Sequence, residues 1–133
     1  MTVVLDSQAL VLLAAHDRTL QHIIAAAVAE RARVVVPAVV LAETMTGKLS
    51  DAAMWHLLNR LAVLDVTARI AARAGAMRER GAKTRAKKRD LTVDAIVAAC
   101  AQTVAPSTII TTDPSDLAML VDTKHVQVVS CSG

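Results

Sequence analysis

Short apolar runs recur along the chain, each bounded by polar or turn-forming residues. The first of them, in TVVLD, has no alternation of apolar and polar positions, which is typical of a strand buried on both faces. Similar runs follow at wide intervals, so the sequence predicts several short strands. Their expected bounds are 3–5, 33–36, 63–66, 108–111 and 126–129.

Longer segments with a helical period separate these runs. Several begin at residues whose side chains cap helices well, namely Ser7, Asp17, Ser50 or Asp51, Thr67 and Thr92. Pro37 suits the first turn of another helix, while Gly47 and Gly81 are expected to end helices. Strand and helix therefore alternate along the chain. This alternation predicts an α/β protein, a three-layer α/β/α sandwich whose mostly parallel central sheet is covered on both faces.

The composition predicts one domain with an aliphatic core. At 133 residues the chain has room for one core, so residues 1–133 are expected to form a single domain. Hydrophobic residues make up 54% of it, yet Trp55 is the only aromatic residue, and we expect it in the core or at a protein interface. Cys100 and Cys131 follow no metal-ligand spacing and are expected to be free thiols.

The chain has no feature typical of export or of a membrane span. It begins directly with a strand-like run, without a basic segment or a cleavage site. No window reaches the ~18 uninterrupted apolar residues of a membrane helix. We therefore expect a soluble, cytoplasmic protein that does not bind a membrane.

The distribution of charge is more informative than the net charge of +3. Nine of the fifteen Lys and Arg residues lie between Arg69 and Arg89, and only Glu79 opposes them there. Such an asymmetric positive field favours a polyanionic partner, with nucleic acid as the leading candidate. The residues expected to contact its phosphates are Lys83, Arg85, Lys87, Lys88 and Arg89. The same run could instead be a solvated loop.

Five acidic residues occupy positions at which a carboxylate suggests a site. Asp6 follows the first predicted strand and Asp113 follows the fourth, so both fall at the carboxyl edge of a parallel sheet, where ligands bind. Glu43 and Asp94 lie in otherwise apolar helices, and Asp116 comes soon after Asp113. A carboxylate among core-facing residues is costly without a partner. Mg²⁺ and Mn²⁺ prefer oxygen ligands, so the joint pattern favours a metal site.

Each acid also has a simpler explanation. Asp6 and Asp113 could be helix caps. Asp94 and Asp116 could prefer the first turn of a helix, where a negative charge is favourable. Glu43 could face solvent on an amphipathic helix. These alternatives stay open for each residue taken singly, and the metal site rests on all of them together.

Four short motifs, in their order, resemble the PIN domain and especially its VapC-type toxin branch. The motifs are LDS near the start, AE after the second strand, DAIVAAC late in the chain and TTDPSDL near its end. The resemblance spans nearly the whole chain. It implies a doubly wound α/β/α fold, an acidic cluster that binds Mg²⁺ or Mn²⁺, and hydrolysis of single-stranded RNA. It also implies two protein partners, a cognate antitoxin and a second copy of the chain, with the helices around Trp55 helping to form both surfaces.

The resemblance assigns roles by position. The acids of the family correspond to Asp6, Glu43, Asp94 and Asp113, with Asp116 as a frequent fifth. We expect Asp6, Asp94 and Asp113 to be the metal ligands. Glu43 and Asp116 would bind through water, hold a second ion or help to deprotonate the attacking water.

Three further positions bear on the resemblance. Thr111 matches the threonine or serine that often precedes the fourth acid. Gln8 stands where many members have a small polar residue, and Leu117 replaces a common aromatic residue. The two departures weaken assignment to a subfamily, but they change none of the carboxylates.

Other functions fit the sequence less well. A signalling receiver domain needs adjacent acids after the first strand, and Asp65 and Lys124 stand in poor contexts for its other functional residues. A DNA nuclease of the flap-cutting type needs longer insertions than this chain has. A PIN-like module that only binds RNA or protein, without catalysis, would be favoured by a missing acid, yet every position is filled. The sequence therefore predicts an Mg²⁺-dependent endoribonuclease, the toxin component of a type II toxin–antitoxin system.

Overall fold

The protein is built around a five-stranded sheet with the order β3-β2-β1-β4-β5, and every neighbouring pair of strands is parallel. The computed structural model describes residues 1–82 and 90–131. Within them the strands are β1 (Thr2–Leu5), β2 (Arg33–Pro37), β3 (Ala62–Leu64), β4 (Ser107–Thr111) and β5 (Val126–Ser130). These are the strands that the apolar runs predict, and their bounds shift only slightly.

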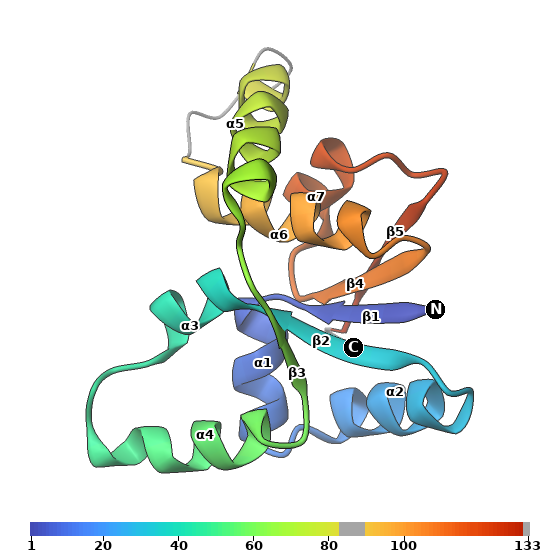
Figure 1. Cartoon of the computed structure of the whole chain (residues 1–133). Helices are drawn as coiled ribbons and strands as arrows, with labels where there is room; N and C mark the ends of the chain where they lie inside the picture. Colours follow the sequence, from blue (N-terminus) through green and yellow to red (C-terminus); the bar gives the residue numbers. More distant parts are fainter. Residues whose placement is uncertain (83–89, 132–133) are drawn as a thin grey trace.

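Helices cover both faces of this sheet, which confirms the predicted three-layer α/β/α sandwich. They are α1 (Ser7–Ala14), α2 (Arg18–Ala29), α3 (Ala38–Thr44), α4 (Ala52–Leu58), α5 (Ala68–Ala82), α6 (Thr92–Thr103) and α7 (Pro114–Leu120). One outer layer contains α1, α2 and α4, and the other contains α5, α6 and α7 (Figure 1). The first residues of α1 and α6 and the whole of α3 lie at the carboxyl edge of the sheet (Figure 1). No helix in the described part of the chain has the length and apolar character needed to cross a bilayer.

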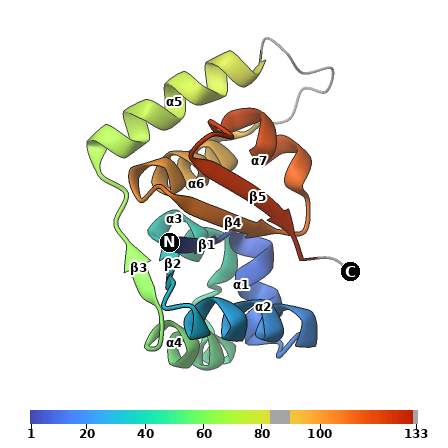
Figure 2. The ribbon, with the colours of Figure 1, turned by 90° about the vertical axis from the view of Figure 1, so that its right-hand side faces the viewer.

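The core is aliphatic, as the composition predicted. Leu5 of β1 and Val35 of β2 are both 0% exposed, and burying a side chain of this kind contributes about 1.5–3 kcal/mol. Small buried residues such as Ala98 allow α6 to pack between the sheet and α5 (Figure 2). Trp55 is 54% exposed, so its expected place in the core is wrong and the alternative of an interface stays open. Both cysteines are free and buried.

Two predicted helix caps are confirmed by side-chain hydrogen bonds. The Asp17 carboxylate accepts the N–H of Leu20 at 3.0 Å, at the start of α2. The Thr67 hydroxyl accepts the N–H of Ile70 at 3.2 Å, at the start of α5. In each case one of the amides that a helix start leaves without an intrahelical partner is satisfied.

Asp51 holds the N-cap position of α4, one of the two positions predicted, but its side chain does not act as the cap. A 3-10 turn, Leu49–Asp51, precedes α4, and the Asp51 side chain makes no capping bond. Its carboxylate instead accepts the N–H groups of Thr46 and Gly47, at 3.0 and 2.7 Å, and the Thr46 hydroxyl at 2.8 Å. Desolvation acts to raise the pKa of Asp51, but these hydrogen bonds from the preceding loop outweigh it and lower the pKa. The side chain therefore stabilises the connection between α3 and α4.

The prediction that Gly81 ends a helix is also wrong. Helix α5 continues through Ala82, and Gly81 is a buried residue that packs against α7. A Cβ atom at Gly81 would lie 3.1 Å from Cδ2 of Leu120. The glycine therefore serves the close packing of α5 on α7 and does not serve a turn.

Candidate functional site

Asp6 lies at the junction of β1 and α1. Its N–H donates to the carbonyl of Ile110 at 3.3 Å, which continues the pairing of β1 with β4 by one residue. Its Oδ1 accepts the N–H of Ala9 at 2.9 Å, so Asp6 is the cap of α1 and the prediction of Ser7 as the cap is wrong. The residue is only 7% exposed. The capping role uses one carboxylate oxygen and leaves the other for a second partner.

The surroundings of Asp6 favour its neutral form. Burial raises the pKa of Asp6, and the nearby Glu43 carboxylate raises it further. Hydrogen bonds from the Thr111 hydroxyl and from the amides of Gln8 and Ala9 oppose this change without reversing it. A cation bound beside the carboxylate would stabilise its charged form, because an opposite charge at short range lowers a carboxyl pKa.

Glu43 is brought to the same place by α3, which directly follows β2. The Ser7 hydroxyl donates a hydrogen bond to Oε1 of Glu43, and this bond joins the start of α1 to the end of α3. The Glu43 side chain is exposed, as its simpler explanation required, but it does not point away from the other acids. With Asp6 and Asp94 it lines a hollow of about 210 Å³ at the carboxyl edge of the sheet.

Asp94 reaches this hollow from the first turn of α6. The prediction of Thr92 as the cap of α6 is wrong, because Leu91 holds that position and Thr92 is the first helical residue. The Thr92 hydroxyl donates to Asp90 Oδ1 at 2.6 Å, and the same oxygen accepts the Thr92 N–H at 3.0 Å. The start of α6 is therefore fixed by Asp90, and Asp94 takes its first-turn position from that arrangement.

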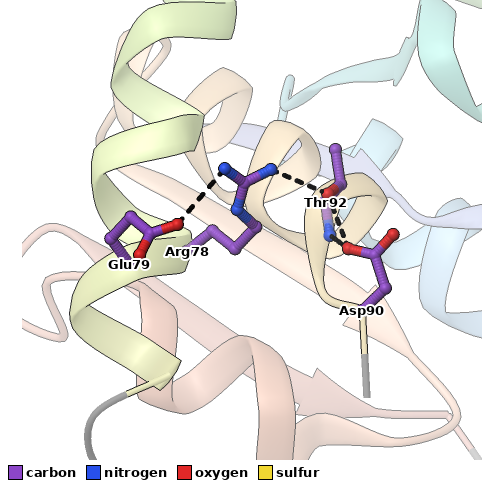
Figure 3. Close-up of polar contacts among 4 residues, drawn as sticks. All are labelled: Arg78, Glu79, Asp90 and Thr92. Atoms are coloured by element: carbon purple, nitrogen blue, oxygen red, sulfur yellow. Dashed lines mark hydrogen bonds and ion pairs between the residues drawn. The ribbon is translucent and has the colours of Figure 1, made fainter. Parts of the chain in front are cut away.

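Arg78 links the start of α6 to α5 (Figure 3). Its guanidinium donates to Oγ1 of Thr92 at 3.0 Å and pairs with Glu79 at 3.4 Å. Hydrogen bonds from Thr92 lower the pKa of Asp90, and Arg78 lowers it further. Four side chains, from α5, from α6 and from Asp90 just before α6, thus form one polar chain beside the turn that carries Asp94.

Arg78→Met should loosen the first turn of α6 without unfolding the protein. Hydrogen exchange at the amides of Thr92 and Ala95 is expected to become faster, by up to about tenfold, because the variant loses a hydrogen bond from a charged donor. Glu79→Gln is the matched control, since it removes the ion pair but keeps the bond to Thr92. Equal exchange rates in the wild type and both variants would contradict the link.

Asp113 lies on the connection from β4 to α7 and Asp116 lies in the first turn of α7, and neither is among the described residues that line the hollow. Asp113 is exposed, and its Oδ1 accepts the Ser115 hydroxyl at 2.9 Å. It stands at the N-cap of α7, the position that its simpler explanation predicted, but its side chain makes no capping bond. Thr111, two residues earlier, contacts both Asp6 and the Asp113 backbone. The second acidic pair therefore adjoins the hollow through Thr111.

The donor set fits a hard divalent cation in its chemistry. The polar side chains that line the hollow present carboxylate, hydroxyl and amide oxygens, and they include no thiol or imidazole. In residues 1–82 and 90–131, no group of three or more His, Cys, Asp or Glu side chains is arranged so that it could hold a metal ion. The metal ligands Asp6, Asp94 and Asp113 stay a prediction. The expected RNA contacts of Lys83, Arg85, Lys87, Lys88 and Arg89 lie outside the described residues.

Sequence reasoning did not identify the hydroxyl groups that hold these acids. Ser7 was expected only as a cap, and it instead binds Glu43. Thr111 was matched to a family position without a physical role, and its hydroxyl lowers the pKa of Asp6 and accepts the N–H of Asp113 at 3.2 Å. The available signal was the placement of each hydroxyl beside an acid at a strand end, in LDS and in TTD.

Comparison with known proteins agrees with this architecture. A chain in the crystal structure of VapBC2 from Rickettsia felis, bound to a DNA fragment from their promoter, superposes with a TM-score of 0.77 at 16% identity, covering 98% of both chains. A chain of VapBC-1 from nontypeable Haemophilus influenzae gives a TM-score of 0.72 at 19% identity over 100% of both chains. A chain of DNA-bound VapBC from Salmonella typhimurium gives 0.72 at 14% identity over 98% of both. At such low identities the likeness shows the fold alone.

The sequence itself matches one family. No curated protein matches the chain in sequence. The profile of the PIN domain, however, matches residues 3–118, from β1 into α7, and this stretch includes all five predicted acids. Since the match covers most of its length, the chain belongs to the PIN domain family.

Proposed function

We propose that this protein is an Mg²⁺-dependent endoribonuclease and the toxin of a type II toxin–antitoxin system. The observation that carries the proposal is the convergence of Asp6, Glu43 and Asp94, from three separate elements, on one hollow at the carboxyl edge of the sheet. Membership of the PIN domain family supports a nuclease, and the likeness to VapBC structures supports a toxin. The reaction would take place in the cytoplasm, where its RNA substrate is.

Asp6 and Asp94 would hold Mg²⁺, with Asp113 approaching from the adjoining β4–α7 connection. When bound, the ion would polarise the scissile phosphate and lower the pKa of a water molecule beside it. The capping bond from Ala9 fixes one oxygen of Asp6, and the nearby Thr111 hydroxyl lowers the pKa of the same carboxylate. Asp6 is thus held in place before any ligand binds.

Glu43 is placed to accept a proton from the attacking water. The Ser7 hydroxyl occupies its Oε1 and so fixes the side chain at the rim of the hollow, with Oε2 left to act as the base. A positioned carboxylate of this kind contributes about 10²–10⁴-fold to a hydrolysis. Asp116, half-buried on α7, would act through water or hold a second ion.

The direct test is cleavage of a labelled single-stranded RNA by the purified protein, with Mg²⁺ and with EDTA. We expect cleavage in Mg²⁺ or Mn²⁺, no cleavage in EDTA, and recovery when Mg²⁺ is added back. Cleavage that continues in EDTA would exclude a metal mechanism. RNA binding without cleavage in either metal would favour the alternative, a catalytically inactive PIN-like module that binds RNA or protein.

The antitoxin would bind the outer face of α1, α2 and α4. Two hollows of about 520 and 420 Å³ on this face share Leu13, Leu57 and Arg60, so they form one groove. Its apolar lining and the cations Arg33 and Arg60 suit an apolar segment that carries acidic side chains. A homodimer is expected as well, and light scattering of the free protein would measure it.

Leu57→Asp should weaken antitoxin binding by at least about tenfold, because it places a charge in the middle of an apolar contact. The antitoxin to use is the protein encoded by the neighbouring reading frame, and calorimetry would give the affinity. RNA cleavage should stay unchanged. Leu49→Asp is the control, since Leu49 is 96% exposed and lies outside the groove. Equal affinities of the two variants would place the antitoxin elsewhere.

A further inference from the structure

Helix α5 carries three exposed arginines along one side, at Arg69, Arg73 and Arg80. At 100° per residue, Arg73 and Arg80 lie within about 40° of Arg69 around the helix axis, and the three span roughly 16 Å along it. We call this set the arginine stripe. It belongs to the outermost helix of its layer, with α6 beneath it (Figure 2).

The described part of the fold does not use these charges. Within the described ranges, none of the three arginines forms an ion pair or a hydrogen bond. Arg78 of the same helix, in contrast, is engaged by both Thr92 and Glu79. Exposed cations without a local partner contribute little to stability, so a role in binding explains the arginine stripe better.

The arginine stripe borders a groove between α5 and the end of α6. Arg69 and Arg73 line a hollow of about 280 Å³ together with Gln102 and Thr103. Arg80 lines a larger hollow of about 700 Å³, which also includes Gln102, so the two hollows adjoin. The smaller one is lined by charged and polar side chains apart from the buried Ile70, which suits a solvated polyanion and not an apolar protein surface.

The end of α5 that carries Arg80 lies near the candidate active site. The bond from Arg78 to Thr92 places this end of α5 beside the first turn of α6, the turn that carries Asp94 (Figure 3). Arg80 follows Arg78 by two residues. Arg69 and Arg73 lie toward the opposite, N-terminal end of α5, beside the last residues of α6. At 100° per residue Arg80 lies about 160° around the axis of α5 from Arg78, so a chain that leaves the site at Asp94 would pass around this end of α5 and then follow the stripe.

We propose that the groove beside the arginine stripe binds the sugar–phosphate backbone of single-stranded RNA, several nucleotides away from the cleaved bond. Guanidinium groups match phosphate oxygens in a bidentate way, and Gln102 and Thr103 add uncharged polar groups that suit a ribose. The groove offers no aromatic side chain for stacking, so it recognises the backbone and not the base. Asp122 lines only the larger hollow, which makes the end at Arg69 and Arg73 the stronger phosphate site. The inference rests on the proposed function, because RNA is its ligand.

The test compares Arg69→Gln/Arg73→Gln with Arg18→Gln/Arg31→Gln. The second pair removes the same charge from exposed positions outside the groove, on α2 and directly after it. Binding of a fluorescent 20-nucleotide single-stranded RNA is measured in EDTA at several salt concentrations. Two lost phosphate contacts should lower the slope of log affinity against log salt by about 1.4, and the control pair should leave it unchanged. In Mg²⁺ the groove variant should raise KM for the 20-mer but keep kcat, and cleavage of a tetranucleotide should not change.

Each other outcome has a distinct meaning. An unchanged slope, or an equal change in the control pair, overturns the groove while the proposed nuclease stands. A change of oligomeric state in light scattering together with an unchanged slope would make this face a protein interface and overturn the inference as well. If the wild type binds RNA and the slope falls as expected but no RNA is cleaved, the proposed reaction fails and the groove stands.

Discussion

Asp6→Asn is expected to abolish Mg²⁺-dependent cleavage of RNA and yet to stabilise the metal-free protein. Loss of a metal-holding charge removes several kcal/mol of transition-state stabilisation, which corresponds to a rate decrease of at least about a hundredfold. The asparagine oxygen can still accept the N–H of Ala9, so the cap of α1 is kept. What the variant loses is a buried negative charge beside Glu43.

The gain in stability should depend on pH. Burial raises the pKa of Asp6, with a further contribution from Glu43, so the folded-state pKa lies above the unfolded-state value of about 3.9. Below the unfolded-state pKa the carboxyl is protonated in both states, so it does not lower the free energy of unfolding. As pH rises through the folded-state pKa, the wild type loses stability because the folded protein must ionise a disfavoured carboxyl. Asp6→Asn should therefore melt higher than the wild type at pH 7 in EDTA, and the difference should shrink in acid.

Circular dichroism melts in EDTA and a cleavage assay in Mg²⁺ would measure both effects. Asp6→Ala is the informative control, since it removes the charge and also the cap, which contributes about 1 kcal/mol. It should be inactive and should melt below Asp6→Asn. Undiminished cleavage by folded Asp6→Asn would exclude Asp6 from the site. A lower melting temperature than the wild type at pH 7 would mean that Asp6 acts mainly as a cap.

The second large effect is expected at Asp94. Asp94→Asn should reduce cleavage by at least about tenfold and should also reduce the stabilisation that Mg²⁺ provides. An ion that binds only the folded state stabilises it by about 1.4 kcal/mol at ten times its dissociation constant. Removing one carboxylate of the hollow should weaken the binding of Mg²⁺ and so decrease the stability that the ion adds. In EDTA the variant should melt higher than the wild type, because a repulsion among the clustered acids is relieved.

Asp90→Asn separates this role from a role at the start of α6. Asp90 accepts two hydrogen bonds from Thr92 but does not line the hollow. Its replacement should lower the melting temperature and leave the gain from Mg²⁺ intact. If Asp94→Asn behaves in the same way, Asp94 is a residue of the helix start and does not belong to the site.

The strands and the layers could be predicted because their signals are local. A short apolar run such as Val3 to Leu5 indicates a buried strand wherever it stands. The order of the strands could not be predicted, since the apolar runs are too similar to specify their neighbours. The prediction that Gly81 ends a helix failed because a glycine is needed there for another reason. Leu120, which lies far away in the sequence, packs too close to leave room for a larger side chain.

Part of the site could be predicted because some of its signals are local as well. Asp6 stands at a strand end, and the carboxyl edge of a parallel sheet gathers such residues by topology. Glu43 and Asp94 were found through the mismatch between a charged side chain and an apolar helix. The position of Asp113 depends on how the β4–α7 connection turns, which Ser115 and Thr111 decide through hydrogen bonds. Similarly, Thr92 failed as a cap because Asp90 and Arg78 engage its hydroxyl.

The exposed position of Trp55 determines which optical methods can follow this protein. With no tyrosine or phenylalanine in the chain, its indole is the sole source of intrinsic fluorescence. Since it is 54% exposed on α4, its emission should change little when the core melts, and a fluorescence trace would underestimate unfolding. Three residues of α4 near it in sequence, Ala53, His56 and Leu57, line the groove proposed for the antitoxin. The same indole should therefore shift its emission to shorter wavelength when that partner covers it, so complex formation could be titrated without any added label.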